Sequence, residues 1–296
     1  MCCSEASAQE TVPLSKAIDC LQTMGSNIPP FEYEGTYQSV QEPNEKLGLQ
    51  RQVSTGHIKY FSSNNKWFFT VNWGDKVYGP VAFNGTVTQS IDTVPPGAKR
   101  LVIKNGEFKT DPMMGWYNFF YEPFYFIALS QLDKDSEYGL KASDLSSKEL
   151  WSKLAKTAVG VSTKTIRGHN CIVIKLTGAN SMLNNESYDV TVYLASDLGY
   201  YPIRSEKNYA RLKTKIIKDV YDFGTFNVEG VGALPLYYPK KQVETMFTDD
   251  VLTETATKTI TQFKIGSIDD NQFTIDPSSV DMILDADKKL IIDVPR

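Results

Sequence analysis

Hydrophobic residues near the start of the chain change their spacing once, from a helical period to a strand period. Apolar residues recur first at intervals of three and four, the spacing of one face of an amphipathic helix: Leu14, Ala17, Ile18, Leu21 and Met24. The stretch 27–30 contains Asn and two Pro and ends this predicted helix. From there the period is two, and one face of a first strand is predicted to carry Phe31, Tyr33, Gly35 and Tyr37.

Further segments in which apolar and polar residues alternate follow this strand, with short turn sequences between them. The turn sequences SSNN, WGD, NG and PPG are typical of links between antiparallel neighbours. Consecutive strands with short turns usually pair with each other. We therefore expect a meander of strands over residues 52–61, 66–73, 76–83, 86–91 and 99–104.

The middle of the chain has a helical pattern. Eight aromatic residues occupy eleven positions in WYNFFYEPFYF, residues 116–126, and Pro123 must kink or divide a helix there. Ser146 and Glu149 form a candidate capping box for a second helix. These patterns predict a helical insert from about 112 to 158.

Strand patterns resume after the insert, over residues 171–176, 190–194, 200–209, 211–223, 234–238, 242–248 and 257–265. No repeat or linker divides the chain, so residues 9–296 are expected to form a single domain. An antiparallel sheet of this size usually curls or closes. The predicted fold class is α+β, mainly antiparallel: a curved incomplete β-barrel, or half-barrel, with the helical insert as a lid over its concave face.

The aromatic run predicts where a ligand would bind. Each aromatic side chain buries about 150–250 Å², so the run must face a core, a membrane or an apolar ligand. A packed core helix is the usual fate of such a stripe, but these rings cover more than one side of a helix. The predicted ligand contacts are Trp116, Phe119, Phe120, Phe124 and Phe126 on the lid, and Trp67, Phe69, Val71, Val192 and Leu194 on the cavity walls.

Composition narrows the classes of function. The net charge is −4 and the pI is about 5.4, which argues against nucleic-acid binding. Arg211, Lys213 and Lys215 alternate with apolar residues and are predicted to lie on the solvent face of a strand. Ala6-Ser7-Ala8 resembles the end of a signal peptide without its apolar region. Residues 1–8 are expected to be a residual export signal, or alternatively a short cytosolic tail.

Catalytic and metal-binding patterns are weak. His57 and His169 lack metal-ligand spacing to another His or Cys, and the acidic pairs at 269–270 and 285–287 lack the pattern of a calcium loop. His169-Asn170-Cys171 has no marked base beside its thiol. We expect no metal, no cofactor and no enzymatic activity, with an unrecognised hydrolase as an alternative. Cys20 and Cys171 allow either one disulfide or two buried thiols.

Several segments together resemble the LolA/LolB lipoprotein-sorting family. They are the helix after an export signal, Tyr33-x-Gly35-x-Tyr37, the central lid, the hairpin VTVYLASDLGYYPIRSE at 190–206, and FKIGSIDDNQFTIDP at 263–277. The resemblance implies a monomeric periplasmic carrier that shelters the acyl chains of lipoproteins, or another lipid, between membrane-bound donor and acceptor proteins on the way to the outer membrane. The family's inward-facing arginine has two candidates, Arg51 and Arg100. The alternative is a periplasmic sensor or scaffold that binds a protein.

Overall fold

One sheet contains every strand of the part of the chain that the structure describes. The computed structural model describes residues 14–73, 76–95, 97–106, 158–181, 186–227 and 235–294. The strands are β1 (Phe31–Gln41), β2 (Gln52–Ser63), β3 (Lys66–Trp73), β4 (Lys76–Phe83), β5 (Val87–Val94), β6 (Ala98–Asn105), β7 (Ala158–Ile166), β8 (His169–Ser181), β9 (Glu186–Ala195), β10 (Tyr201–Tyr209), β11 (Thr214–Phe226), β12 (Leu236–Thr248), β13 (Val251–Ile265), β14 (Met282–Asp285) and β15 (Leu290–Asp293).

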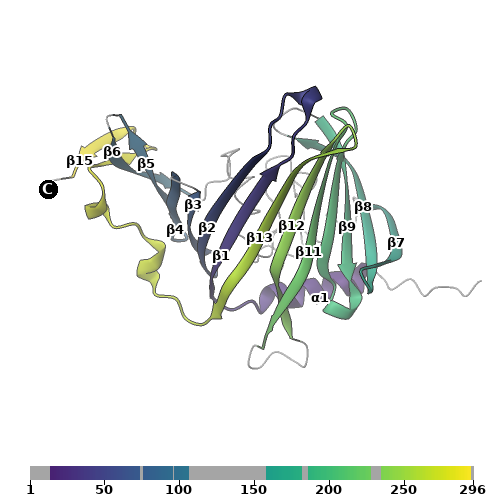
Figure 1. Ribbon diagram of the computed structural model, residues 1–296. Coiled ribbons are helices and arrows are strands. Elements are labelled where there is room, and N and C mark those ends of the chain that lie inside the picture. The colour runs from purple at the N-terminus through teal and green to yellow at the C-terminus, as the bar shows by residue number, and fades with distance from the viewer. Residues whose placement is uncertain are drawn as a thin grey trace, which may run out of the picture.

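The sheet is curved and open. Within the described residues its order is β15-β14-β6-β5-β4-β3-β2-β1-β13-β12-β11-β10-β9-β8-β7, and its two end strands do not pair with each other. Neighbours are antiparallel except β6 and β14, which run parallel. The strands bend around one side of the molecule, as Figure 1 shows. The predicted fold class, a mainly antiparallel incomplete barrel, is confirmed.

The two halves of the chain join where β1 pairs with β13. The strands before the insert extend from β1 to one side, and β12 to β7 extend from β13 to the other. The last two strands, β14 and β15, follow β13 in the sequence but add to the first side, beyond β6. Gly35 lies at a register shift in this junction. A Cβ atom at Gly35 would lie 2.6 Å from the carbonyl oxygen of Thr259, so the close approach of the two strands requires glycine.

Helix α1 (Leu14–Ser26) lies on the concave side of the sheet, behind the lower ends of β9 to β12 in Figure 1. Its apolar stripe is buried: Ala17 and Leu21 are 0% exposed and Met24 is 6% exposed. The predicted helix is confirmed and ends two residues beyond Met24.

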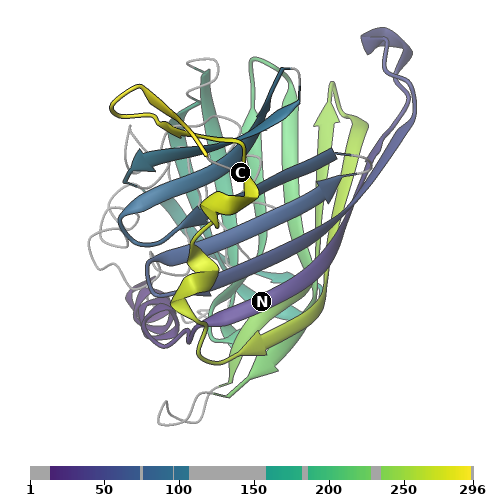
Figure 2. The ribbon, with the colours of Figure 1, turned by 90° about the vertical axis from the view of Figure 1, so that its left-hand side faces the viewer.

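The segment after β13 crosses the outer side of the sheet, in front of the strands in Figure 2. It contains two short 3-10 helices, η5 (Asp270–Phe273) and η6 (Pro277–Ser279), before β14 and β15. Its Ile275 and Val280 form a small second core with Ala82 and Leu101. Asp269, one of the aspartates noted in the sequence, has a local structural role: it accepts a hydrogen bond from a backbone N–H group at the start of η5, as Asp276 does at the start of η6.

Several strand boundaries differ from the predictions. The predicted strand at 211 begins at Thr214 as β11, because Lys213 has a left-handed φ of 48° in the preceding turn. Strands predicted at 234–238 and 242–248 are one strand, β12. Residue 158, the predicted end of the insert, is the first residue of β7.

Some predictions lie outside the described residues: the export segment 1–8, the insert from 112 to 157 and the aromatic run 116–126. In the part of the chain that is described, no helix has the length and apolarity to cross a membrane.

Candidate functional site: the concave face of the sheet

Alternation along β1 determines which side chains line the concave face. The odd-numbered residues from Phe31 to Ser39 are buried, and the even-numbered residues between them are half-buried or exposed. The predicted common face of Phe31, Tyr33, Gly35 and Tyr37 is therefore confirmed. Residues that lie opposite each other on paired strands share a face of the sheet, so the registers identify the concave residues on the neighbouring strands.

The lower half of this face, where β1 begins and α1 lies, is apolar. The predicted wall residues Trp67, Phe69 and Val71 on β3 are buried. They belong to the same core cluster as Val192 and Leu194 on β9 and as the buried stripe of α1. The structure thus brings together wall residues that are more than a hundred positions apart in sequence. The predicted lid contacts Trp116, Phe119, Phe120, Phe124 and Phe126 lie outside the described residues, so ligand binding by the set stays a prediction.

A row of aromatic rings crosses this apolar half and was not identified as a site from the sequence. Phe31 lies 5.9 Å from Tyr60 and 5.3 Å from Phe263 between ring centroids. Tyr238 stacks on Phe263 at 4.0 Å, and Phe226 lies 6.3 Å from Tyr238. The row spans β2, β1, β13, β12 and β11 in that order. Aromatic residues at alternate strand positions were the available signal, but only the register of the strands aligns them.

The upper half of the concave face, toward the β1–β2 and β12–β13 hairpins, is polar. The register places Tyr37 opposite Lys258, and Lys258 opposite Gln242. In the next row toward the hairpins, Lys218 lies opposite Glu244. Lys258 is 1% exposed, Gln242 0% and Lys218 7%. Buried charges are rare in proteins unless they are paired or functional, and none of these residues was identified from the sequence.

The electrostatics of this polar half reflect its burial. Burial raises the pKa of the Glu244 carboxyl, and the nearby lysines Lys218 and Lys207 oppose that shift. Burial also raises the pKa of the Tyr37 hydroxyl. Ser39 donates a hydrogen bond of 2.7 Å from Oγ to Oε1 of Glu254. The polar half thus combines two buried lysines, Lys218 and Lys258, with two half-buried glutamates, Glu244 and Glu254.

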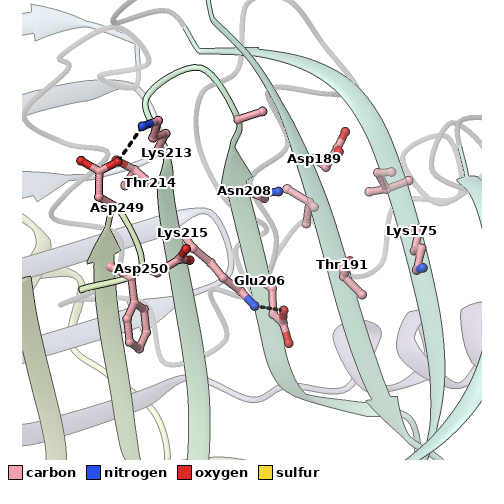
Figure 3. A pocket seen from close by; sticks show the side chains of 14 residues that line it. Lys175, Asp189, Thr191, Glu206, Asn208, Lys213, Thr214, Lys215, Asp249 and Asp250 are labelled. Carbon is pink, nitrogen blue, oxygen red and sulfur yellow. Dashed lines mark ion pairs between the residues drawn. The ribbon is translucent and has the colours of Figure 1, made fainter. Parts of the chain in front are cut away.

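The outer face carries a separate pocket of about 680 Å³ over β8 to β12, which Figure 3 shows. Lys213 Nζ lies 3.1 Å from Asp249 Oδ1, and Lys215 Nζ lies 2.9 Å from Glu206 Oε2. Lys215 lies on the solvent face of β11, as predicted, whereas Lys213 lies in the turn before this strand. Both charges are paired with neighbours near solvent. Pairs of this kind contribute little to stability, and the mixed charges favour no single ligand class.

His169 and Cys171 do not form a reactive pair. The His169 ring contacts Asp197 through Nδ1 at 2.7 Å, but the Cys171 thiol donates weakly to the backbone oxygen of His169 at 3.5 Å. Burial raises the pKa of Cys171 to about 11, opposite to the shift of a catalytic thiol. Cys20 and Cys171 are both free thiols. Among the described residues no group of His, Cys, Asp and Glu has metal-binding geometry.

The two arginine candidates differ in their surroundings. Arg100 holds Asp92 with two hydrogen bonds, from Nε at 3.0 Å and from Nη2 at 2.6 Å. It lies on β6 in the arm of the sheet that also contains β14 and β15. Arg51 is exposed just before β2. Neither is in the polar half of the concave face, where the cations among the described residues are lysines.

Two solved structures are similar in fold. A LolA superfamily protein from Nitrosomonas europaea matches 88% of this chain and 98% of its own, with 9% identity and a TM-score of 0.46. A DUF1329 family protein from Desulfovibrio piger matches 90% of this chain and 99% of its own, with 9% identity and a TM-score of 0.43. No protein-family model and no curated protein matches the sequence. The first structure bears the family name that the sequence resemblance gave, and at this identity neither says what this chain binds.

Proposed function

We propose that this protein binds an amphiphile with an acyl chain on the concave face of its sheet and carries it between membranes. The acyl chain lies along the apolar half, against the aromatic row and α1. The polar head lies in the half that holds Lys218, Lys258 and Glu244. Export to the periplasm, transfer from a donor to an acceptor, and lipoprotein cargo are the parts of this proposal that rest on the sequence resemblance.

The observation that carries the proposal is the change of polarity along one continuous face. On β1 the concave side chains change from Phe31 and Tyr33 to Ser39, and on β13 they change from Phe263 to Lys258 and Glu254. A core built only for stability gains by being apolar throughout, since buried charges cost free energy. An amphiphile has the same change of polarity along its length.

The charge of the polar half favours an anionic head. In the described part of this half three lysines, Lys207, Lys218 and Lys258, accompany two glutamates, Glu244 and Glu254. Burial raises the pKa of Glu244, so this site favours the neutral carboxyl more than water does. A carboxylate or phosphate head is therefore favoured over a cationic one.

The first experiment is native mass spectrometry of the full chain expressed with an export signal, followed by solvent extraction and uptake of a fluorescent fatty acid. A bound lipid, lost together with fatty-acid uptake in the Phe120→Asp, Phe124→Asp double variant, supports the proposal. Tyr221→Asp is the matched control, because Tyr221 is 55% exposed on β11. A ligand-free protein that takes up no fatty acid contradicts the carrier and favours the scaffold alternative.

A second measurement tests the orientation of the ligand. Lys218→Met and Lys258→Met remove charge from the polar half and retain much of the side-chain volume. Each is expected to weaken binding of a fatty acid by about tenfold, the loss of one charge-assisted contact, and to leave binding of the fatty alcohol of equal length nearly unchanged. Equal losses for acid and alcohol would contradict placement of the head in this half.

A further inference from the structure

The strand β15 presents an exposed apolar edge at one end of the sheet. Within the described residues it pairs with β14 alone. Its three apolar residues are half exposed: Leu290 49%, Ile291 56% and Ile292 49%. Figure 1 shows this edge at the tip of the arm formed by β5, β6, β14 and β15, away from the concave face. Open edges of this kind are templates for pairing with another strand, and proteins usually protect them with charge or shape.

The pairing with β14 fixes which backbone groups of β15 point outward. Val294 donates its N–H to the carbonyl of Asp281 on the β14 side, at 3.0 Å. The backbone N–H and C=O groups of successive residues in a strand point to opposite sides. Ile292 and Leu290, two and four residues before Val294, therefore also point their backbone groups toward β14. Ile291 and Asp293 therefore point theirs to the open side.

We propose that a second copy of this chain docks on this edge, with the two β15 strands antiparallel and Ile291 opposite Ile291. Residues that face each other in an antiparallel ladder must both point their backbone groups toward the partner, and Ile291 meets this condition with itself. This register also places Leu290 opposite Ile292 of the second copy. Apolar side chains then meet on both faces of the new strand pair.

Charge complementarity supports this register. Asp293 is the last residue of β15, and Lys289 is the turn residue just before the strand, with a left-handed φ of 54°. Both are exposed. Pairing centred on Ile291 brings the turn that carries Lys289 of each copy beside Asp293 of the other, so that the long lysine side chain reaches the carboxylate and two ion pairs form across the two-fold axis. A register shifted by two residues would place Asp293 opposite Ile291 and lose both pairs.

The interface is small, because only a four-residue strand from each copy contributes. It falls below the roughly 1,200 Å² that stable complexes bury. We therefore infer a monomer–dimer equilibrium that depends on protein concentration, in place of the strict monomer implied by the sequence resemblance. The inference does not rest on the proposed amphiphile binding, since β15 lies apart from the concave face.

Sedimentation velocity of the full chain over a hundredfold concentration range tests the inference. The wild type is expected to shift toward the dimer as concentration rises. Ile291→Lys places two cations at the axis and is expected to abolish the shift. Tyr221→Lys is the matched control, because it also replaces an exposed apolar residue by lysine but lies on β11. A wild type that stays monomeric throughout the range would overturn the inference.

Charge reversal tests the register itself. Lys289→Asp alone and Asp293→Lys alone each create like-charged pairs, and each is expected to raise the dimer dissociation constant about tenfold. The double variant, and an equal mixture of the two single variants, restore opposite charges and are expected to recover wild-type affinity. Pairing through β15 in this register would be contradicted if neither the double variant nor the mixture recovered wild-type affinity. It would also be contradicted if neither single change altered the dimer dissociation constant.

Discussion

Lys218 and Glu244 lie directly opposite each other on β11 and β12, on the concave face, where Lys218 is buried and Glu244 is half-buried. A lysine directly opposite a glutamate would ordinarily lower the pKa of the glutamate carboxyl. The burial effect is larger here, and the pKa of Glu244 is raised. This pair therefore opposes folding when the glutamate is charged, a cost that proteins commonly accept at functional sites.

The raised pKa predicts a pH-dependent effect of Glu244→Gln. The folded state holds the proton of Glu244 more tightly than the unfolded state, so stability falls as pH rises from the ordinary glutamate range through the raised pKa. Replacement by the neutral amide removes this loss. The variant should be close to wild type in urea unfolding at pH 4 and more stable at pH 8. Glu34→Gln, at an exposed position on β1, should change stability by less than about 1 kcal/mol. A Glu244→Gln variant that is less stable at pH 8 than at pH 4, relative to wild type, would refute the assignment.

A methyl group at Gly35 should disrupt the junction of the two halves of the sheet. The new Cβ of Gly35→Ala would press on the backbone oxygen of Thr259, which cannot rotate away. We expect a loss of about 1–3 kcal/mol in the free energy of unfolding. Gly160→Ala is the control, because nothing lies within 4 Å of a Cβ there, and alanine in the β7 strand should be neutral or stabilising. Equal effects of the two substitutions would contradict the close approach of β1 and β13.

Alkylation should distinguish the two described cysteines. With a pKa of about 11, Cys171 exists as thiolate in about one molecule per thousand at pH 8. Its side chain is also only 2% exposed. Peptide mapping after brief iodoacetamide treatment should show modification of Cys20 well before Cys171. Simultaneous modification, or a disulfide between the two, would contradict the structure.

The contact between Gln89 and Ile275 should control attachment of the C-terminal segment. Gln89 accepts a hydrogen bond from the Ile275 N–H at 2.8 Å, in a buried environment. Gln89→Leu leaves that N–H without an acceptor, at a cost of about 1–3 kcal/mol. Hydrogen exchange over residues 266–285 should accelerate in this variant and much less in Gln89→Glu, which keeps an acceptor oxygen. Unchanged protection in Gln89→Leu would show that the contact does not hold the segment.

The local elements could be predicted well from the sequence because their signals are local. The spacing of Leu14 to Met24 identified α1, and the alternation from Phe31 to Tyr37 identified the residues that share one face of β1. Only the structure shows that this face is the concave one. Boundaries were less accurate. The alternation of Arg211 and Lys213 with apolar neighbours predicts a strand there, but Lys213 has a left-handed backbone and lies in the turn before β11.

The candidate site could be predicted only in its apolar part. Trp67, Phe69 and Val71 have the hydrophobic alternation that marks a buried strand face, and they are buried. Lys258 and Lys218 alternate in the same manner as solvent-facing lysines, so no local pattern marks them as buried. Their position follows from the registers of β13 with β1 and of β12 with β11.

The sequence by itself determined helix α1, most of the strands, which residues share a strand face and the class of fold, because periodicity and turn chemistry depend on residues a few positions apart. It predicted neither the strands β7, β14 and β15 nor which face of the sheet is concave. The tertiary structure decided that β13 returns to β1 and that β14 adds in parallel to β6. It thereby also determined the aromatic row, the buried charges and the open edge at β15. These features depend on which distant strands become neighbours, and strand pairing is set by the free energy of the whole sheet, which no short segment encodes.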